Sequence, residues 1–296
     1  MKCPLCEKEK HRNIVTISKD TLIKKYFNYV DVDFSYLIKE DITYYECQNC
    51  KLRFFYPFVT GDETFYNSLQ KFDWYYMDEK DEYHVAKKYI KEIDKVLEIG
   101  CGKGAFKQFL KTEDYIGLEF SKNAKKLAKK QGIKIKNKSI EEFSKKNLNK
   151  FDVAASFQVL EHVSNPKSFI EAKLNTLKKG GKMIISVPAE DSYLKYISNG
   201  LLNMPPHHIT RWPTKTLKFI AQEYNLKILD IVHEELQEVH KINYINTLVR
   251  NSITHSKLLD DSINPSFINT MTNLLVKGLK KEMLPKGHTI SVIFEK

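Results

Sequence analysis

The sequence lacks an apolar run long enough to cross a membrane, and its first residues, Met1-Lys2-Cys3-Pro4, lack the apolar stretch of a signal peptide. We therefore expect a cytoplasmic protein with no membrane span. Of its 296 residues 42% are hydrophobic, which is enough for a substantial core. The chain can form one large α/β domain with an appendage, or two modest domains.

Arginine is also scarce. Only four of the 48 basic residues are arginines, so the net charge of +11 comes almost entirely from lysine. Lysine pairs such as Lys125-Lys126 fall on expected helix surfaces, which favours a general surface bias over an acidic partner. Because arginine is the preferred reader of bases and phosphates, its scarcity counts against a nucleic acid partner. A small acceptor that is phosphorylated or linked to a nucleotide stays compatible with the basic surface.

Cysteine is infrequent too, but its placement is informative. Four of the five cysteines form two C-x-x-C pairs, Cys3 with Cys6 and Cys47 with Cys50. Two such pairs can bring four thiolates to one tetrahedral zinc ion in a closed, structural site, and residues 43–46 and 53–56 are expected to be the strands of a zinc-ribbon hairpin. A redox pair and a nucleic-acid-binding ribbon are the alternatives. The first lacks its usual βα context here, and the second lacks a basic cluster interleaved with aromatic residues.

A glycine-rich turn organises the middle of the chain. The apolar run over residues 96–99 predicts a buried parallel strand, and Phe106, Phe109 and Leu110 follow at helical spacing. Between them, residues 98–104 have the pattern Glu-x-Gly-x-Gly-x-Gly. These glycines let the backbone bend sharply and come close to a ligand, with a spacing that differs from the dinucleotide pattern G-x-G-x-x-G.

This pattern resembles motif I of the class I S-adenosylmethionine-dependent methyltransferases. Two later stretches resemble the same family in the expected order: Val159-Leu160-Glu161-His162-Val163 after a strand that begins near Asp152, and Lys178-Lys179-Gly180-Gly181 before an apolar strand. The resemblance covers roughly residues 60 to 234. It implies a Rossmann-like, seven-stranded α/β sheet with helices on both faces, here with a small N-terminal zinc ribbon, and S-adenosylmethionine as the methyl donor.

The resemblance also implies which residues bind the cofactor. Glu119, an acid at the tip of the second strand, is expected to accept hydrogen bonds from both ribose hydroxyls. Ile140 and Glu141 are expected to flank the adenine, with an exposed helix start as the alternative. The full set predicted to bind the cofactor is Glu98, Gly100, Cys101, Gly102, Gly104, Glu119, Phe120, Ile140, Glu141, Phe157 and Gln158.

The acceptor is expected beside a loop after the fifth strand, because ligands bind at the carboxyl edge of a parallel sheet. That loop contains two histidines, which could instead form a structural turn, and the aromatic residues before motif I could simply pack at an interface. The predicted general bases are His207 and His208, then His162 and Tyr76, and the predicted substrate-binding residues are Tyr66, Tyr75, Arg211 and Trp212.

The expected organisation has four parts. They are a zinc-ribbon-like domain at 1–60, a helical and aromatic linker or lid at 61–94, a methyltransferase core at 95–234 and 288–296, and a mainly helical insertion at 235–287. The resemblance implies that the strands on either side of the insertion are antiparallel neighbours. The insertion could shape the acceptor pocket or support a homodimer, and a monomer is equally compatible.

A zinc ribbon before such a core resembles bacterial methyltransferases that modify nucleotide-linked sugars and other building blocks of surface polysaccharides and capsules. The resemblance implies an oxygen or nitrogen of such a building block, or a phosphate-type decoration, as the methyl acceptor. One alternative is an RNA methyltransferase that holds RNA with the ribbon. Another is a non-catalytic module that binds the cofactor or a partner protein.

Overall fold

The computed structural model describes residues 1–72, 77–255, 264–276, 278 and 284–296. In chain order its elements are β1 (His11–Ile17), α1 (Lys19–Val30), β2 (Ile42–Cys47), β3 (Arg53–Tyr56), α2 (Glu63–Leu69), α3 (Asp81–Lys87), β4 (Val96–Ile99), η1 (Ala105–Phe109), β5 (Tyr115–Leu118), α4 (Lys122–Lys130), β6 (Ile135–Lys136), α5 (Ile140–Ser144), β7 (Phe151–Phe157), η2 (Leu160–His162), α6 (Pro166–Thr176), β8 (Leu177–Pro188), η3 (Tyr193–Tyr196), η4 (Leu201–Asn203), β9 (Thr210–Arg211), α7 (Thr214–Glu223), β10 (Lys227–His233), α8 (Glu238–Thr254), α9 (Pro265–Val276) and β11 (Thr289–Glu295), where η marks a 3₁₀ helix.

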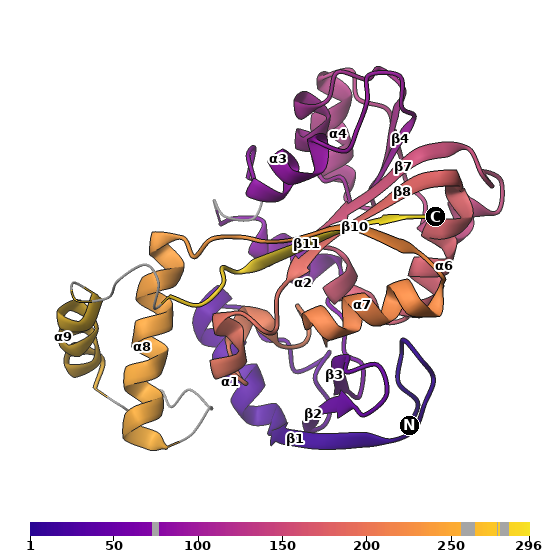
Figure 1. Ribbon diagram of the computed structural model, residues 1–296. Helices are drawn as coiled ribbons and strands as arrows, with labels where there is room; N and C mark the ends of the chain where they lie inside the picture. Colours follow the sequence, from indigo (N-terminus) through magenta and orange to yellow (C-terminus); the bar gives the residue numbers. More distant parts are fainter. Residues whose placement is uncertain (73–76, 256–263, 277, 279–283) are drawn as a thin grey trace.

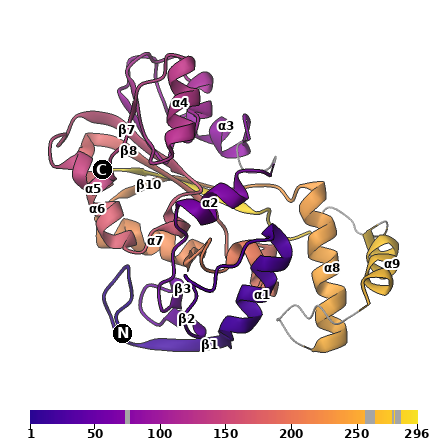
Figure 2. The same ribbon diagram turned by 180° about the vertical axis from the view of Figure 1, so that it is seen from behind.

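Seven strands form the central sheet, in the order β10-β11-β8-β7-β4-β5-β6. β4 pairs in parallel with β5 and β7, whereas β11 runs antiparallel between β8 and β10. Figures 1 and 2 show α4 on one side of this sheet and α6 and α7 on the other. These features confirm the expected α/β fold and the antiparallel pairing of the last two strands.

Local sequence signals explain where the helices begin. The side chains of Ser121 and Asn165 each accept a hydrogen bond from a backbone N–H in the first turn of α4 and α6, and Pro166 is the first residue of α6. The helix expected after the glycine turn is the short 3₁₀ helix η1, not an α-helix. Phe106 on η1 is nevertheless fully buried, so the turn still connects a core strand to a packed helix.

The second sheet has the order β1-β2-β3-β9 and joins two distant parts of the chain. β2 and β3 form the expected antiparallel hairpin, with Thr43 opposite Tyr56. β9 follows the fifth strand of the central sheet in sequence but pairs with β3, with Arg53 opposite Arg211. The N-terminal hairpin therefore shares a sheet with the loop that carries the candidate histidines.

Helices α8 and α9 lie between β10 and β11 in the sequence. Figure 1 shows them beside one another at one end of the molecule, away from α4 and α6. Ile245 of α8 is buried in a small apolar cluster with Tyr193 and Leu194 from η3, which anchors the helices to the segment after β8. Among the residues that the structure describes, no helix is both long enough and apolar enough to cross a membrane.

Candidate active site

The glycine turn borders a large cavity at the carboxyl edge of the central sheet. Gly100, Gly102 and Gly104 all have positive φ angles, of 71°, 51° and 82°. Gly100 and Gly102 line a cavity of about 1360 Å³. A Cβ atom at Gly100 would lie 2.4 Å from a methyl carbon of Val159, so this position has no room for a side chain. Left-handed backbone and close approach together explain why the turn uses glycine.

Gly104 packs against the segment before β6. It is not among the described residues that line the cavity, and a Cβ atom there would lie 2.6 Å from Cδ1 of Ile133. The glycine lets η1 start close to the segment before β6. Packing and the φ angle account for the glycine at this position, and contact of Gly104 with the cofactor stays a prediction.

Glu119 lies directly after β5 and is positioned by the turn itself. Its two carboxylate oxygens accept hydrogen bonds from the backbone N–H groups of Gly102 (3.0 Å) and Ser121 (2.7 Å). Each oxygen keeps a second lone pair, which is the capacity that a ribose diol requires. The neighbouring Phe120 is 65% exposed and also lines the cavity, so an apolar ring is available beside this carboxylate.

Two predicted adenine contacts are not at the cavity. Ile140 is 2% exposed and belongs to the main apolar core, while Glu141 lies 3.5 Å from the Ser168 hydroxyl on α6. Neither is among the described residues that line the cavity. Because Ser139 caps α5, the helix begins with Ile140 turned into the core. The alternative prediction, that these residues begin a helix, agrees with the structure, although Ile140 is buried and not exposed.

Glu98 and Cys101 form the buried floor of the cavity near the turn. Glu98 is 1% exposed and accepts a hydrogen bond from the Tyr115 hydroxyl, and burial raises the pKa of its carboxyl to about 8. Burial also raises the pKa of the Cys101 thiol. The raised pKa values favour the neutral forms of both groups near pH 7.

Phe157 and Gln158, at the end of β7, line the middle of the cavity. Gln158 has a φ of 55°, and its side-chain amide donates to Glu82 (3.2 Å) and to the Thr289 hydroxyl (3.3 Å). Sequence reasoning did not find Glu82 or Thr289 as cavity residues. Glu82 falls in a stretch expected to be a linker, and Thr289 begins the last strand, so no local motif marks either one.

Three histidines line the same cavity, and we name His162, His207 and His208 the histidine cluster. One ring nitrogen from each lies within 4.8 Å of the others. His162 is on η2 after β7, whereas the other two belong to the loop before β9. Burial lowers the pKa of His162 to about 3, with a further contribution from His207, whose own pKa is lowered to about 4. Burial also lowers the pKa of His208, so all three imidazoles are neutral at pH 7.

Glu161 lies against the histidine cluster and was not predicted as a site residue. Its side chain is 1% exposed, and neither carboxyl oxygen has a hydrogen-bond partner among the described residues. Burial raises the pKa of this carboxyl to about 8. The only sequence signal was its place directly before His162 in the post-strand motif, which does not indicate that the side chain is buried beside two further histidines.

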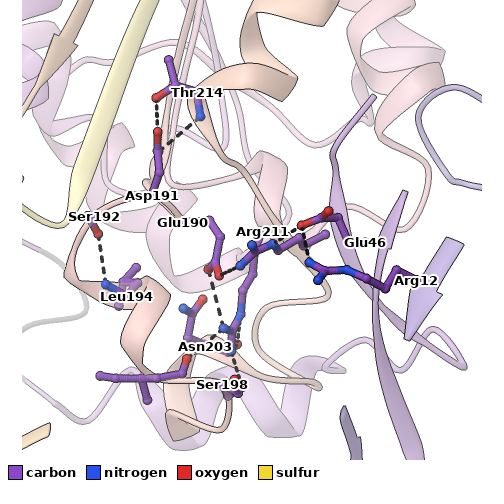
Figure 3. Close-up of polar contacts among 12 residues, drawn as sticks. Arg12, Glu46, Glu190, Asp191, Ser192, Leu194, Ser198, Asn203, Arg211 and Thr214 are labelled. Atoms are coloured by element: carbon purple, nitrogen blue, oxygen red, sulfur yellow. Dashed lines mark hydrogen bonds and ion pairs between the residues drawn. The ribbon is translucent and has the colours of Figure 1, made fainter. Parts of the chain in front are cut away.

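The structure contradicts the predicted roles of Arg211 and Trp212. Arg211 is 2% exposed, and its guanidinium donates to the backbone oxygens of Ile197, Ser198 and Asn203 (Figure 3). Trp212 is fully buried and donates through Nε1 to the Thr210 hydroxyl (3.0 Å).

Ion pairs explain why Arg211 is buried. Its guanidinium lies 3.6 Å from Glu190, which also pairs with Arg53 of β3 at 2.5 Å, as Figure 3 shows in part. It also lies over the rings of Tyr44 and Phe55, with its central carbon 4.7 and 5.1 Å from their centroids. Arg211 therefore fastens the N-terminal sheet to the central domain and does not face the acceptor cavity.

Of the three predicted tyrosines, the structure describes only Tyr66. Tyr66 on α2 lines the cavity, and its hydroxyl lies 3.4 Å from Nδ1 of His162. Burial raises the pKa of Tyr66, so it remains a phenol in the physiological range. Tyr75 and Tyr76 lie outside the described residues.

The four paired cysteines come together as the spacing predicts. Their sulfur atoms lie within 4.8 Å of one another, with Cys3 to Cys50 and Cys6 to Cys47 both at 3.5 Å. Four thiolates bound to zinc at about 2.3 Å would lie about 3.8 Å apart, so the arrangement fits a tetrahedral ion. The two turns are alike, because the residue after each pair, Glu7 or Lys51, has a positive φ of 58° or 63°.

Comparison with known families agrees with this geometry. Residues 73–231 match a family model described as a methyltransferase domain, which is more than half of the chain. The chain belongs to this methyltransferase family. A solved S-adenosylmethionine-dependent methyltransferase from Archaeoglobus fulgidus has the same fold, with a TM-score of 0.54 and 19% identity over 79% of this chain and all of that one.

Sequence relatives of this methyltransferase domain include an uncharacterised protein of Methanocaldococcus jannaschii, 40% identical over 33% of this chain and 46% of that protein. A mitochondrial ubiquinone biosynthesis O-methyltransferase of Dictyostelium discoideum is 34% identical over 35% of this chain and 37% of its own length. A ubiquinone biosynthesis O-methyltransferase of Vibrio atlanticus is 28% identical over 61% of this chain and 77% of the relative. The first two matches thus span less than half of the relatives' length.

Proposed function

We propose that this protein transfers the methyl group of S-adenosylmethionine to an oxygen of a small hydroxylated acceptor. The observation that carries the proposal is that one cavity is lined both by the glycine turn with Glu119 and by the histidine cluster with Glu161. We call the first group the donor end of the cavity and the second group the acceptor end. Membership of the methyltransferase family supports S-adenosylmethionine as the donor. Two relatives are ubiquinone biosynthesis O-methyltransferases, which supports oxygen as the acceptor atom.

The charge of the residues that line the cavity further restricts the chemical class of the acceptor. Nine aspartate and glutamate residues and three lysines are among the described residues that line it. This lining disfavours phosphate groups deep in the cavity and disfavours RNA, whereas sugar hydroxyls can donate to the carboxylates. We therefore propose a sugar-like acceptor, with any phosphate or nucleotide portion near the lysine-rich exterior. A nucleotide-linked sugar or a related capsule building block remains the proposed class.

The chemistry needs alignment and removal of one proton. The acceptor oxygen attacks the methyl carbon, the carbon–sulfur bond breaks with its electron pair moving to sulfur, and neutral S-adenosylhomocysteine is released. The hydroxyl proton leaves at the end of the cavity where the histidine cluster and Glu161 lie. The role of this chain's residues is to hold both partners in line and to lower the pKa of the acceptor hydroxyl.

The test is to incubate the protein with methyl-labelled S-adenosylmethionine and four acceptor pools: nucleotide sugars, unphosphorylated sugars, catechols and total RNA. The expected result is label in a sugar pool. Label only in RNA would overturn the proposal and support the RNA alternative. Cofactor binding by calorimetry with no label in any pool would support the non-catalytic module instead.

We also propose that the four paired cysteines hold a structural zinc ion. The supporting observations are the close thiol group and the two matching turns that present it. The site has four protein ligands, and none of these cysteines is among the described residues that line the cavity. The ion would therefore stabilise the N-terminal sheet and take no part in methyl transfer.

A further inference from the structure

We propose that the histidine cluster and Glu161 form a binding site for a divalent transition-metal ion of the Zn²⁺, Fe²⁺ or Mn²⁺ class. This site is separate from the four-cysteine site and opens into the acceptor end of the cavity. The inference that the ion contacts the acceptor rests on the proposed function. The inference that the ion binds does not.

The spacing of the three ring nitrogens suits one ion. They lie within 4.8 Å of one another. Nitrogens bound to a common ion at about 2.1 Å are about 3.4 Å apart in a tetrahedral shell, so small side-chain rotations would bring them into coordination. Imidazole nitrogen is a preferred ligand of zinc and iron, which sets the metal class.

The outer nitrogens are already positioned by oxygen atoms. Nδ1 of His162 lies 2.6 Å from the carbonyl oxygen of His207, and Nδ1 of His207 lies 2.8 Å from the carbonyl oxygen of Leu202. Nδ1 of His208 lies 3.0 Å from Oδ1 of Asn203. Because these oxygens accept, each Nδ1 carries the hydrogen and each Nε2 keeps its lone pair. Metal-binding histidines characteristically have this second set of hydrogen bonds, which fixes the ring orientation.

Glu161 supplies the independent observation. Its Oε1 lies 3.9 Å from Nε2 of His162 and 3.9 Å from Nε2 of His208. That separation is too long for a direct hydrogen bond, so the carboxyl and the two imidazoles do not satisfy one another. A carboxyl that is 1% exposed, without a donor among the described residues, is costly unless it faces a cation. A shared metal ion would be bound by all of these lone pairs together.

The two metal sites would differ in purpose. Four thiolates close the coordination shell of the cysteine site, whereas the histidine cluster and Glu161 lie at the cavity wall. An ion there can accept a further oxygen ligand from the cavity, and a bound hydroxyl has a lowered pKa. The ion would therefore orient the acceptor hydroxyl at the place where the proposed reaction requires it.

The test measures metal content and does not depend on turnover. Full-length protein is saturated with Zn²⁺, freed of excess by gel filtration and measured by metal mass spectrometry. We expect two equivalents for the wild type and one for a His207→Gln, His208→Gln double variant. His240→Gln, which changes a histidine that lines the same cavity outside the cluster, is the matched control and should keep two equivalents.

Cobalt distinguishes the two sites within one sample. Co²⁺ is added to protein that has been saturated with zinc and then washed with EDTA. The sample should give a d–d spectrum without a thiolate charge-transfer band. Glu161→Gln should weaken Co²⁺ binding at least about tenfold. One zinc equivalent in the wild type, or two in the double variant, would overturn the proposal. If circular dichroism shows that the double variant does not fold, the Co²⁺ affinity of Glu161→Gln and the wild-type cobalt spectrum test the metal site instead. Two metal equivalents without methylation of any acceptor would reject the proposed function and leave the metal site standing.

Discussion

The two ends of the cavity, for which we propose donor and acceptor binding, are built in opposite ways. At the donor end the backbone dominates, with glycines at positive φ and a carboxylate, Glu119, held by two N–H groups. At the acceptor end side chains from separate segments converge, and one of them, Glu161, has no partner of its own among the described residues. The donor end is thus complete before a ligand arrives, whereas the acceptor end has unsatisfied capacity that a ligand or ion must fill.

A single substitution in the glycine turn should disable the donor end alone. Gly102→Leu should weaken S-adenosylmethionine binding at least about 100-fold, or about 2.7 kcal/mol, because the new side chain enters the cavity at a φ of 51°. Calorimetric titration measures the affinity, and zinc content should not change. Gly132→Leu is the matched control, since Gly132 also has a positive φ (73°) but a Cβ atom there meets nothing within 4 Å. Equal loss of cofactor binding in both variants would contradict the assignment.

A substitution at the acceptor end should not change the affinity for S-adenosylmethionine. We expect His208→Gln to lower kcat about 10²- to 10⁴-fold, because the acceptor hydroxyl loses a group that lowers its pKa. The Kd for S-adenosylmethionine should stay within about twofold. Single-turnover kinetics and calorimetry measure the two quantities. A variant with wild-type kcat would exclude His208 from the reaction.

Arg211 sharpens the comparison because it lies just behind the acceptor end. Arg211→Met should destabilise the protein by about 3–5 kcal/mol, since it leaves the buried carboxylate of Glu190 with one partner fewer. Arg12→Met, whose side chain is 61% exposed and pairs with Glu46, should cost less than about 1 kcal/mol. Urea unfolding measures both changes. Full stability in Arg211→Met, with only KM altered, would restore the acceptor-binding role for this arginine.

The smallest effect concerns the pH dependence of the cofactor-free protein. The pKa of Glu98 is raised to about 8 in the folded state, so its contribution to stability is fully present below the unfolded value near 4.5 and is lost as the pH rises through 8. Glu98→Gln should reduce the fall in thermal midpoint between pH 5.5 and 8.5 by about 2–4 °C or more, the shift that 1 kcal/mol produces in a chain of this size. An unchanged fall would show that Glu98 is already ionised when folded.

The fold and the donor end could be predicted because their signals are contiguous. Residues 96–104 contain the strand, the glycine turn and Glu98 together, and Glu119 follows directly after the next strand, β5. Asn165-Pro166 marks a helix start within two residues. The thiol group was predictable as well, because a C-x-x-C pair is itself a turn. In each case the functional residues and the backbone turn that positions them lie within a few residues of one another in the sequence.

The acceptor end could be predicted only in part. The histidines were found by residue type, but the burial of Arg211 follows from the pairing of β9 with β3, whose partners are more than 150 positions apart. Glu161 was missed because its significance depends on a loop that begins far along the chain. Long-range pairing, which a motif does not encode, decides these two positions. At the donor end, by contrast, Ile140 was assigned by analogy and is buried in the core at the start of α5.

The strand β9 has a consequence for modularity. The loop with His207 and His208 continues directly into β9, and the backbone N–H of Phe55 in β3 donates to the carbonyl of Ile209 (3.0 Å). The loop that carries two members of the histidine cluster is therefore held at the edge of a hairpin that the first sixty residues provide. A chimera with a different N-terminal sheet would have to reproduce this strand edge. Without it, the chimera would keep the residues proposed to bind the cofactor but would lose the loop shape proposed to select the acceptor.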